Sequence, residues 1–141
     1  MRAEIVVYDG VDELDAIAPF EVLSIAARSV ELSLALVGAD AGLMTGRSAT
    51  THRAARDALA GSGARLVDAR VDDDGDIVSS AGVTSGLDLA PWLVERYFGA
   101  ALAAAVAHQI EYVRHGPIWQ AAGSASHRAW KTRPETTKTA R

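Results

Sequence analysis

The sequence predicts an α/β sandwich with a mostly parallel sheet, because strand-like runs alternate with segments of helical periodicity. Apolar, strand-like runs lie at residues 3–8 (AEIVVY) and 31–37 (ELSLALV), and a segment of helical spacing lies between them at 12–29. A second regular helical segment spans residues 100–113. The chain has 141 residues, a length that suggests one domain with a core of its own.

The first unit begins with Ala3–Tyr8, a short β-branched run that ends at Asp9-Gly10, as expected for a buried strand followed by a turn. In the next segment, apolar side chains recur at helical spacing at Leu14, Ile17, Ala18, Val22, Ile25 and Ala26. We expect Asp12 to cap this helix. We expect Pro19 to break or kink it near Ala18, because proline removes a backbone hydrogen bond.

The middle of the chain predicts shorter elements. A strand, a helix, a second strand and its hairpin partner are expected at Ser48–Thr51, Arg53–Ala60, Ala64–Val71 and Asp76–Ser80. The helix should end at Gly61-Ser62-Gly63, and Asp74-Gly75 is a strong hairpin signal.

The last third contains one ambiguous helix and one regular helix. Ser85 followed by Asp88 resembles a capping box, which places a helix start near Thr84. Pro91 would then lie inside that helix at a cost of about 3 kcal/mol, or the helix would begin at Pro91 instead. The helix at Ala100–Val113 should end at Gly116-Pro117. We expect residues 1–119 to form the domain and 120–141 a disordered basic tail.

Composition excludes several classes of protein. Hydrophobic residues make up 49% and charged residues 23%, an ordinary globular balance, and no apolar run approaches the roughly 20 residues of a membrane span. Residues 1–115 have a net charge of −8, so we expect no nucleic-acid partner. The chain has no cysteine, and its four histidines lack metal-ligand spacing, so we expect no metal site. The start of the chain lacks a signal-peptide pattern, and we expect a cytoplasmic location.

Two motifs invite a functional interpretation that their details do not support. The run Asp72–Asp76 resembles a calcium loop, but Arg70 and Ala81 stand where an EF-hand needs acidic ligands, so a solvated hairpin turn is favoured. The Gly-rich stretch Gly82–Gly86 precedes a helix and could hold an anion. It matches neither a phosphate loop nor a nucleophile elbow, so close strand-to-helix packing is favoured there.

Three side chains are candidates for chemistry. His52 lies near a strand end, where a helix cap or a structural polar role is the favoured reading over a catalytic base. Asp15 and Glu21 lie on the first helical segment, and ligands of open α/β sheets bind beyond the carboxyl ends of the strands. A partly buried Asp15 there would have a raised pKa and could act as an acid or base. The alternative, an acid that interacts with the helix dipole, fits the spacing equally well.

The segment VYDGVDELDAIAPFEVL resembles the opening of the DJ-1/PfpI superfamily, specifically its isonitrile hydratase-like branch. The resemblance rests on Leu14-Asp15 followed by Pro19–Leu23, and on GRSATTHRAARDAL through DGDIVSSAGVTSGLDLAPWLVERYFG to EYVRHGPIW in the second half. It covers roughly residues 3–119. The resemblance implies a flavodoxin-like three-layer sandwich, a homodimer, and hydration of an isonitrile to an N-substituted formamide without metal or organic cofactor.

The same resemblance implies which residues line a small-molecule site. The family's acidic residue matches Asp15. Thr50, Thr51, His52 and the turn Gly82, Val83, Thr84 and Ser85 match positions at the remains of the pocket.

The family's nucleophilic cysteine lies between stretches that match Val37–Asp40 and Gly46–His52 here. Five residues join these stretches, so about 50 residues or more are missing relative to the family. The resemblance therefore implies a shortened domain without its nucleophile.

We expect a degenerate isonitrile hydratase-like protein that is inactive as a lyase and keeps Asp15 as its acid/base group. The alternative is a non-catalytic binding or dimerisation module of the same family. A third possibility is a gene remnant with no selected function.

Overall fold

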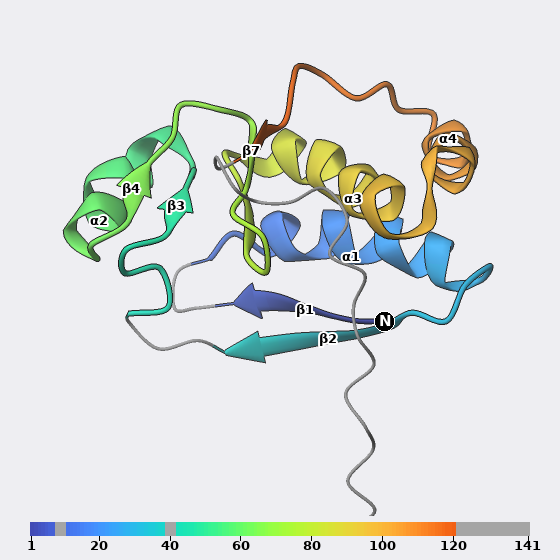
Figure 1. The fold of residues 1–141 in the computed structure, drawn as a ribbon, viewed down its shortest axis with the longest axis horizontal. Coiled ribbons are helices and arrows are strands. Elements are labelled where there is room, and N and C mark those ends of the chain that lie inside the picture. The colour runs from blue at the N-terminus through green and yellow to red at the C-terminus, as the bar shows by residue number, and fades with distance from the viewer. Residues whose placement is uncertain (8–10, 39–41, 121–141) are drawn as a thin grey trace, which may run out of the picture.

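A computed structural model of the chain describes residues 1–7, 11–38 and 42–120 (Figure 1). The elements in chain order are β1 Arg2–Val7, α1 Glu13–Ala27, β2 Ser33–Gly38, β3 Ser48–Ala49, η1 Arg53–Ala55, α2 Arg56–Gly61, β4 Arg65–Leu66, β5 Val71–Asp73, β6 Val78–Ser80, α3 Val83–Phe98, α4 Ala100–Gln109 and β7 Trp119–Gln120. Most of the turn after β1 and the expected tail from residue 121 onward lie outside the described residues, whereas Gln120, the first residue of that tail, belongs to β7. No helix in those ranges is long and apolar enough to cross a membrane.

The strands pair mainly in parallel. The pairs β1–β2, β3–β4 and β5–β7 are parallel, and only the β5–β6 hairpin is antiparallel. They form three small sheets in the part of the chain that the structure describes. The expected α/β class with mostly parallel pairing is confirmed.

The β1–β2 sheet is covered by one helix. Its register pairs Ala3 with Leu34 and Ile5 with Leu36, and among the described elements α1 alone packs directly against both strands. The α3 helix packs against α1, and α4 packs against α3 (Figure 1).

The core lies between the three long helices. Its buried members are Val22, Leu23, Ile25, Ala26, Ala90, Val94, Ala103 and Val106. A Cβ atom on Gly86 would lie 3.3 Å from Pro19 Cδ, so α1 and α3 approach closely at this point. Pro19 is thus part of the packing between the two helices.

Several expected element boundaries are wrong. The α1 helix continues through Pro19 without the predicted break. Of the two starts that the sequence allows for α3, the structure has the one near Thr84, and Pro91 lies inside the helix. Both prolines are buried, and the tertiary packing offsets the lost backbone hydrogen bonds. Gly82, rather than a capping-box residue, is the N-cap of α3.

Two further elements are shorter than the sequence predicts. The expected strand at residues 64–71 is interrupted between β4 and β5, and the expected helix at 100–113 ends at Gln109. The predicted cap of α1 is confirmed, because the Asp12 side chain accepts a hydrogen bond from the Leu14 backbone N–H at 2.9 Å.

Candidate functional site

The carboxyl ends of β1 and β2 face the unit formed by β3, β4 and α2 (Figure 1). The start of α1 lies at the same end of the β1–β2 sheet. In open parallel sheets, ligands bind at this edge, because the loops that follow the strands meet there. A small-molecule site is therefore expected at this edge.

Asp15 lies in the first turn of α1 and is partly buried. Burial raises the pKa of its carboxyl group, the neighbouring Asp12 raises it further, and His52 opposes both effects. A carboxyl group with a raised pKa is suited to general acid–base chemistry.

His52 caps the short helix η1. Its Nδ1 accepts a hydrogen bond from the Ala54 backbone N–H at 3.3 Å, which is the helix-cap role favoured from the sequence. A neutral imidazole that accepts at Nδ1 carries its proton on Nε2, so Nε2 is the available donor. A Cβ atom on Gly82 would lie 3.3 Å from His52 Cδ2, so the ring packs against the start of α3.

The remaining predicted residues separate into two groups. Thr51 is partly buried between β3 and η1. The neighbouring Thr50 donates a hydrogen bond from its backbone N–H to Ser79 Oγ and another from its hydroxyl to the Ala69 carbonyl. Val83 and Thr84 form the first turn of α3, and the Thr84 hydroxyl accepts a hydrogen bond from Arg70 at 3.3 Å. The structure packs His52 against Gly82, and Thr50 joins the end of β3 to β6 and to the chain before β5.

Sequence reasoning missed a buried carboxylate at Asp88. Arg70 Nε donates to its Oδ2 at 2.6 Å, and the His115 backbone N–H and the Tyr112 hydroxyl donate to its Oδ1 at 2.7 and 3.1 Å. Burial and the hydrogen bond to Asp88 raise the pKa of Tyr112. Asp88 therefore joins α3 to the chain before β5 and to the segment after α4. Its spacing in the sequence gave no sign of these distant partners.

The acidic run Asp72–Asp76 is not the solvated turn that the sequence favours. Asp73 is 1% exposed and accepts hydrogen bonds from Trp92 Nε1 at 2.8 Å and from Arg96 at 2.7 Å. Arg47 forms ion pairs with both Asp74 and Asp76. The hairpin itself is confirmed, but its acids connect it to α3 and to the chain before β3.

The carboxyl groups of the hairpin differ in whether they have hydrogen-bond partners. Burial raises the pKa of Asp74, but the hydrogen bond and the positive charge of Arg47 lower it, and the overall shift is downward. Asp72 is completely buried, and within the described ranges neither of its carboxyl oxygens has a hydrogen-bond partner. Burial raises the pKa of Asp72 to about 6, against an opposing effect of the nearby Ser48 hydroxyl.

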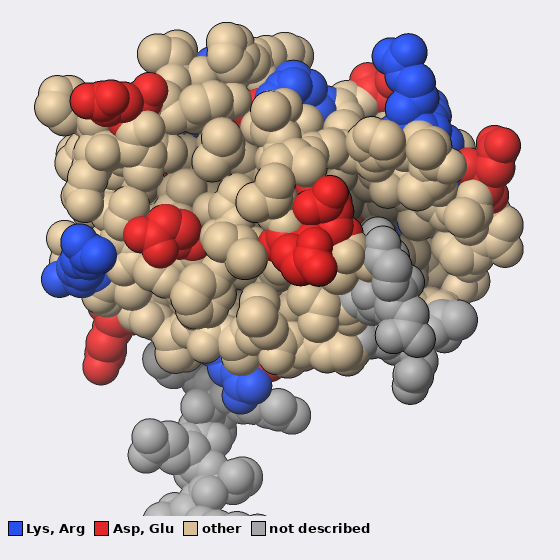
Figure 2. Space-filling view, turned by 180° about the vertical axis from the view of Figure 1, so that it is seen from behind, with Lys and Arg blue, Asp and Glu red and all other residues tan. Residues whose placement is uncertain are grey.

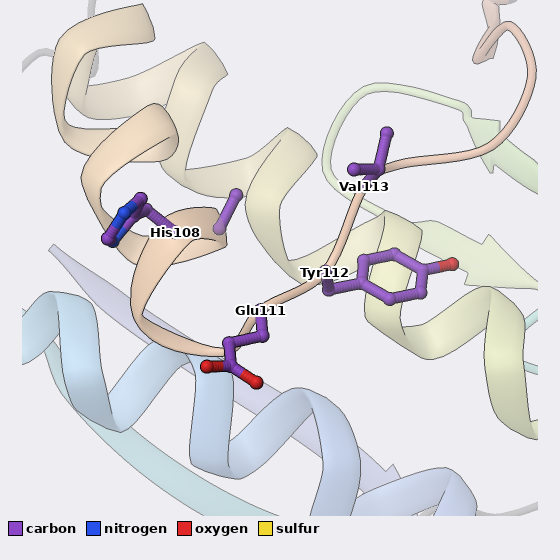
Figure 3. Close-up of a pocket in the computed structure, with 5 residues that line it drawn as sticks. His108, Glu111, Tyr112 and Val113 are labelled. Atoms are coloured by element: carbon purple, nitrogen blue, oxygen red, sulfur yellow. The ribbon is translucent and has the colours of Figure 1, made fainter.

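A shallow depression of about 380 Å³ lies at the end of α4, away from Asp15 and His52. Figure 3 shows that His108, Glu111 and Tyr112 in its wall point in different directions. Because these polar groups do not converge, the depression lacks the arrangement that positions a small ligand.

The surface charges give no sign of a polyanion site on the face that Figure 2 presents. Lys and Arg side chains lie apart from one another there, separated by uncharged residues and by acids. The residues that the structure describes also contain no group of three or more His, Asp or Glu side chains that could hold a metal ion.

Comparison with known proteins identifies relatives for much of the chain. The DJ-1/PfpI family model matches residues 32–96. Isonitrile hydratase from Pseudomonas putida is 40% identical over 83 residues, which are 59% of this chain and 36% of that protein. This chain thus spans about a third of the length of that curated relative.

Solved structures show the same fold. An AraC family transcriptional regulator from Pseudomonas putida superposes with a TM-score of 0.65 at 13% identity, over 77% of this chain and 98% of that chain. DJ-1beta from Drosophila melanogaster gives 0.63 at 13% identity, over 79% and 98%. A THiJ/PfpI family protein from Pseudomonas syringae is 31% identical over 79% of this chain and 51% of that chain, with a TM-score of 0.51.

Proposed function

We propose that this chain is a shortened, isonitrile hydratase-like member of the DJ-1/PfpI family that binds a small molecule without turning it over. The similarity to isonitrile hydratase supports the ligand class, an isonitrile or a related carbon electrophile. The absence of cysteine supports the loss of turnover, because a thiolate is the nucleophile that the resemblance implies.

The observation that carries this proposal is the raised pKa of Asp15 in the first turn of α1, on which His52, packed against Gly82, has an electrostatic effect. Asp15, with its raised pKa, can share a proton with a bound electrophile, and His52 Nε2 can donate a hydrogen bond to it. General acid–base help alone is worth roughly 10²–10⁴-fold in rate, so we expect no turnover on the scale of a complete enzyme.

The test mixes the protein with a small water-soluble alkyl isonitrile and follows both binding and product by NMR. We expect shifts of the amide signals of Asp15 and His52, and no N-substituted formamide above the protein-free rate. The Asp15→Asn variant should weaken binding, whereas Glu13→Gln, which changes an exposed acid of the same helix turn, should not. Formamide production that depends on Asp15 would contradict the loss of activity, and the absence of any shift would remove the proposed ligand.

The second candidate function is a dimerisation module. Leu14 and Ile17 on α1 are 55% and 57% exposed, and Leu36 on β2 is 55% exposed. The outer edge of β2 pairs with no strand in the described part of the chain. Apolar surface beside an unpaired edge favours association, and a second copy of this chain is the partner that we propose.

Sedimentation velocity at several protein concentrations tests this candidate. We expect a dimer that Ile17→Glu converts to a monomer. Val113→Glu serves as the control, because Val113 is 78% exposed and lies in the segment after α4. A monomer at all concentrations, or an equal effect of both substitutions, would rule out this interface.

A further inference from the structure

One face of α1 is exposed and presents both apolar and acidic side chains. Leu14 and Ile17 are 55% and 57% exposed, and Glu13 and Glu21 are exposed as well. Residues three and four apart share one face of a helix, so these four side chains form one stripe, which we call the α1 stripe. The buried residues of α1 lie on its other faces, and α1 packs against the β1–β2 sheet and α3. The described elements therefore leave the α1 stripe uncovered.

The α1 stripe is negatively charged. The α1 helix contains three acidic residues and no Lys, Arg or His. The ion pairs among the described residues include neither Glu13 nor Glu21, whereas exposed acids elsewhere, such as Asp68 and Asp76, have an arginine partner. Among the described helices, α1 alone combines exposed acids outside any ion pair with exposed large aliphatic side chains. This surface fits a positively charged partner that has an apolar anchor.

A segment of this complementary chemistry follows the described residues in the same chain. Residues 121–141 contain five basic residues and one acidic residue, a net charge of +4, against −8 for residues 1–115. Three of the five basic residues, Arg128, Lys131 and Arg133, surround Trp130, the one large apolar residue of this tail. Cations beside an indole ring complement acids beside aliphatic side chains in both charge and apolar character.

The tail is long enough to reach the α1 stripe. The described residues end at Gln120 in β7, which pairs with β5. The chain from there to Trp130 spans up to about 33 Å when it is extended. A domain of the size of residues 1–120 has a radius of gyration of about 14 Å, so most of its surface lies within this reach. A short tether gives an effective concentration on the order of millimolar, so even a weak contact is populated.

We propose that residues 127–133, the tail segment, dock on the α1 stripe of the same chain, with Trp130 against its two aliphatic side chains and the cations near its two acids. The stripe includes apolar side chains of the second candidate function, so a docked tail competes with a second copy of this chain. This competition rests on that candidate function. The docking does not, because its test measures the contact between the tail and α1 within one chain.

The first test uses the absence of cysteine from the chain, because Ala129→Cys then introduces a single site for a nitroxide spin label. At low protein concentration, we expect the label to broaden the amide NMR signals of residues 13–21 more than those of the other described helices. In about 1 M salt the Debye length falls to about 3 Å, so this broadening should weaken. Broadening that is absent, or that is centred on another surface, would overturn the proposal.

Charge reversals within the tail supply a matched control for the labelled chain. Lys131→Glu together with Arg133→Glu should abolish the broadening of α1. Lys138→Glu together with Arg141→Glu reverses as many charges outside the tail segment and should leave the broadening in place. Equal effects of the two pairs would mean that the net charge of the tail, rather than the tail segment, is responsible, which contradicts the proposed docking.

A charge reversal on α1 tests the acceptor surface. Glu21→Lys should weaken the broadening, because it places a cation where the tail segment brings its own cations. Glu31→Lys, at an exposed acid outside α1, should not weaken it. Broadening that survives Glu21→Lys unchanged would mean that the α1 stripe is not the surface that the tail contacts.

A mixed sample separates docking within one chain from docking on a second copy. It combines spin-labelled protein without isotope label and isotope-labelled protein without spin label. We expect no broadening of α1 in this mixture, because each tail contacts its own chain. Broadening as strong as that in the doubly labelled chain would assign the contact to a second copy and overturn the proposal.

Discussion

The β1–α1–β2 unit and the β5–β6–α3 unit are stabilised by different interactions. The first is joined to the rest of the molecule mainly through the apolar face of α1, which supplies Val22, Leu23, Ile25 and Ala26 to the core. The second is connected by buried carboxylates, since Asp73 and Asp88 each accept hydrogen bonds from an arginine and from further donors. Apolar packing tolerates small changes of position, whereas buried ion pairs need one geometry.

This difference indicates which of the two units tolerates the loss of a side chain better. The β1–β2 sheet retains unpaired edges and exposed apolar side chains, while the region around β5 and α3 has its polar groups satisfied, with Asp72 as the exception. The removal of one buried charge should therefore disturb the second unit more than the loss of one apolar side chain disturbs the first.

The largest expected effect is that of Asp88→Ala. This substitution leaves the guanidinium of Arg70, the Tyr112 hydroxyl and the His115 N–H without their acceptor. Asp88 is 0% exposed and Arg70 is 38% exposed, so the pair is only half buried, and we expect the loss of the three hydrogen bonds together to cost about 3–5 kcal/mol. Urea unfolding of the variant should show a loss in this range, and Asp68→Ala, at an exposed ion pair, should change stability by less than about 1 kcal/mol. Similar losses of stability in the two variants would mean that the hydrogen bonds to Asp88 contribute no more than an exposed ion pair does.

The apolar unit is tested by Leu23→Ala. Leu23 is 2% exposed within the core, and deletion of a buried leucine side chain costs about 2–5 kcal/mol depending on how far the cavity collapses. We expect a loss of about 3 kcal/mol, below that of Asp88→Ala, because the surrounding helices can move together. Leu14→Ala, at a half-exposed position of the same helix, should cost less than about 1 kcal/mol. A greater loss of stability for Leu23→Ala than for Asp88→Ala would mean that the apolar unit is the more sensitive of the two.

The sequence predicts the elements of the two units unequally well. Hydrophobic periodicity and local signals such as Asp12 and Asp74-Gly75 are sufficient for α1, β2 and the hairpin, because these features depend on neighbouring residues. Pro19 misleads and Pro91 leaves the start of α3 undecided, since tertiary packing overrides their local preference. The partners of Asp88 lie 18–27 residues away, and no local pattern encodes such distances.

The candidate site could be predicted only in part. The resemblance to a family indicates Asp15 and His52, and a charge on His52 would lower the pKa of Asp15 against the effect of burial. The orphaned carboxylate of Asp72 could not be anticipated, because Asp72 to Asp74 and Asp76 look alike in the sequence. Strand alternation assigns Asp72 and Asp73 to opposite faces, and only the fold shows which face offers donors.

A smaller effect is expected for Asp12→Ala at the start of α1. The Asp12 carboxylate accepts the Leu14 backbone N–H, and the loss of an N-cap costs about 1 kcal/mol. The same substitution removes a negative charge that raises the pKa of Asp15, so the pKa of Asp15 should fall. Thermal unfolding and carboxyl NMR titration measure these two effects. The Glu13→Ala variant is the control, and an equal loss of stability there would argue against a specific cap.

The smallest expected effect is a gain in stability at the end of α4. Glu111 has a φ of +52°, in the left-handed region that favours glycine. Its N–H donates to the His108 carbonyl at 3.2 Å and the Tyr112 N–H donates to the Ala107 carbonyl at 3.0 Å, the pattern of a Schellman helix end. Because Tyr112 continues from this turn to Asp88, the turn connects the apolar helix layer to the polar region.

Glu111→Gly should therefore stabilise the protein by about 0.5–1 kcal/mol, since glycine adopts this conformation without strain. Glu111→Ala removes the same carboxylate but keeps the Cβ atom, so it should give no such gain. Gln109→Gly, inside the last turn of α4, should instead destabilise by about 1 kcal/mol, because glycine in a helix loses more backbone freedom. Thermal unfolding of the three variants under one set of conditions measures the differences. Equal stability of Glu111→Gly and Glu111→Ala would show that the left-handed turn is not retained in solution, and the Tyr112–Asp88 hydrogen bond would then lose its structural basis.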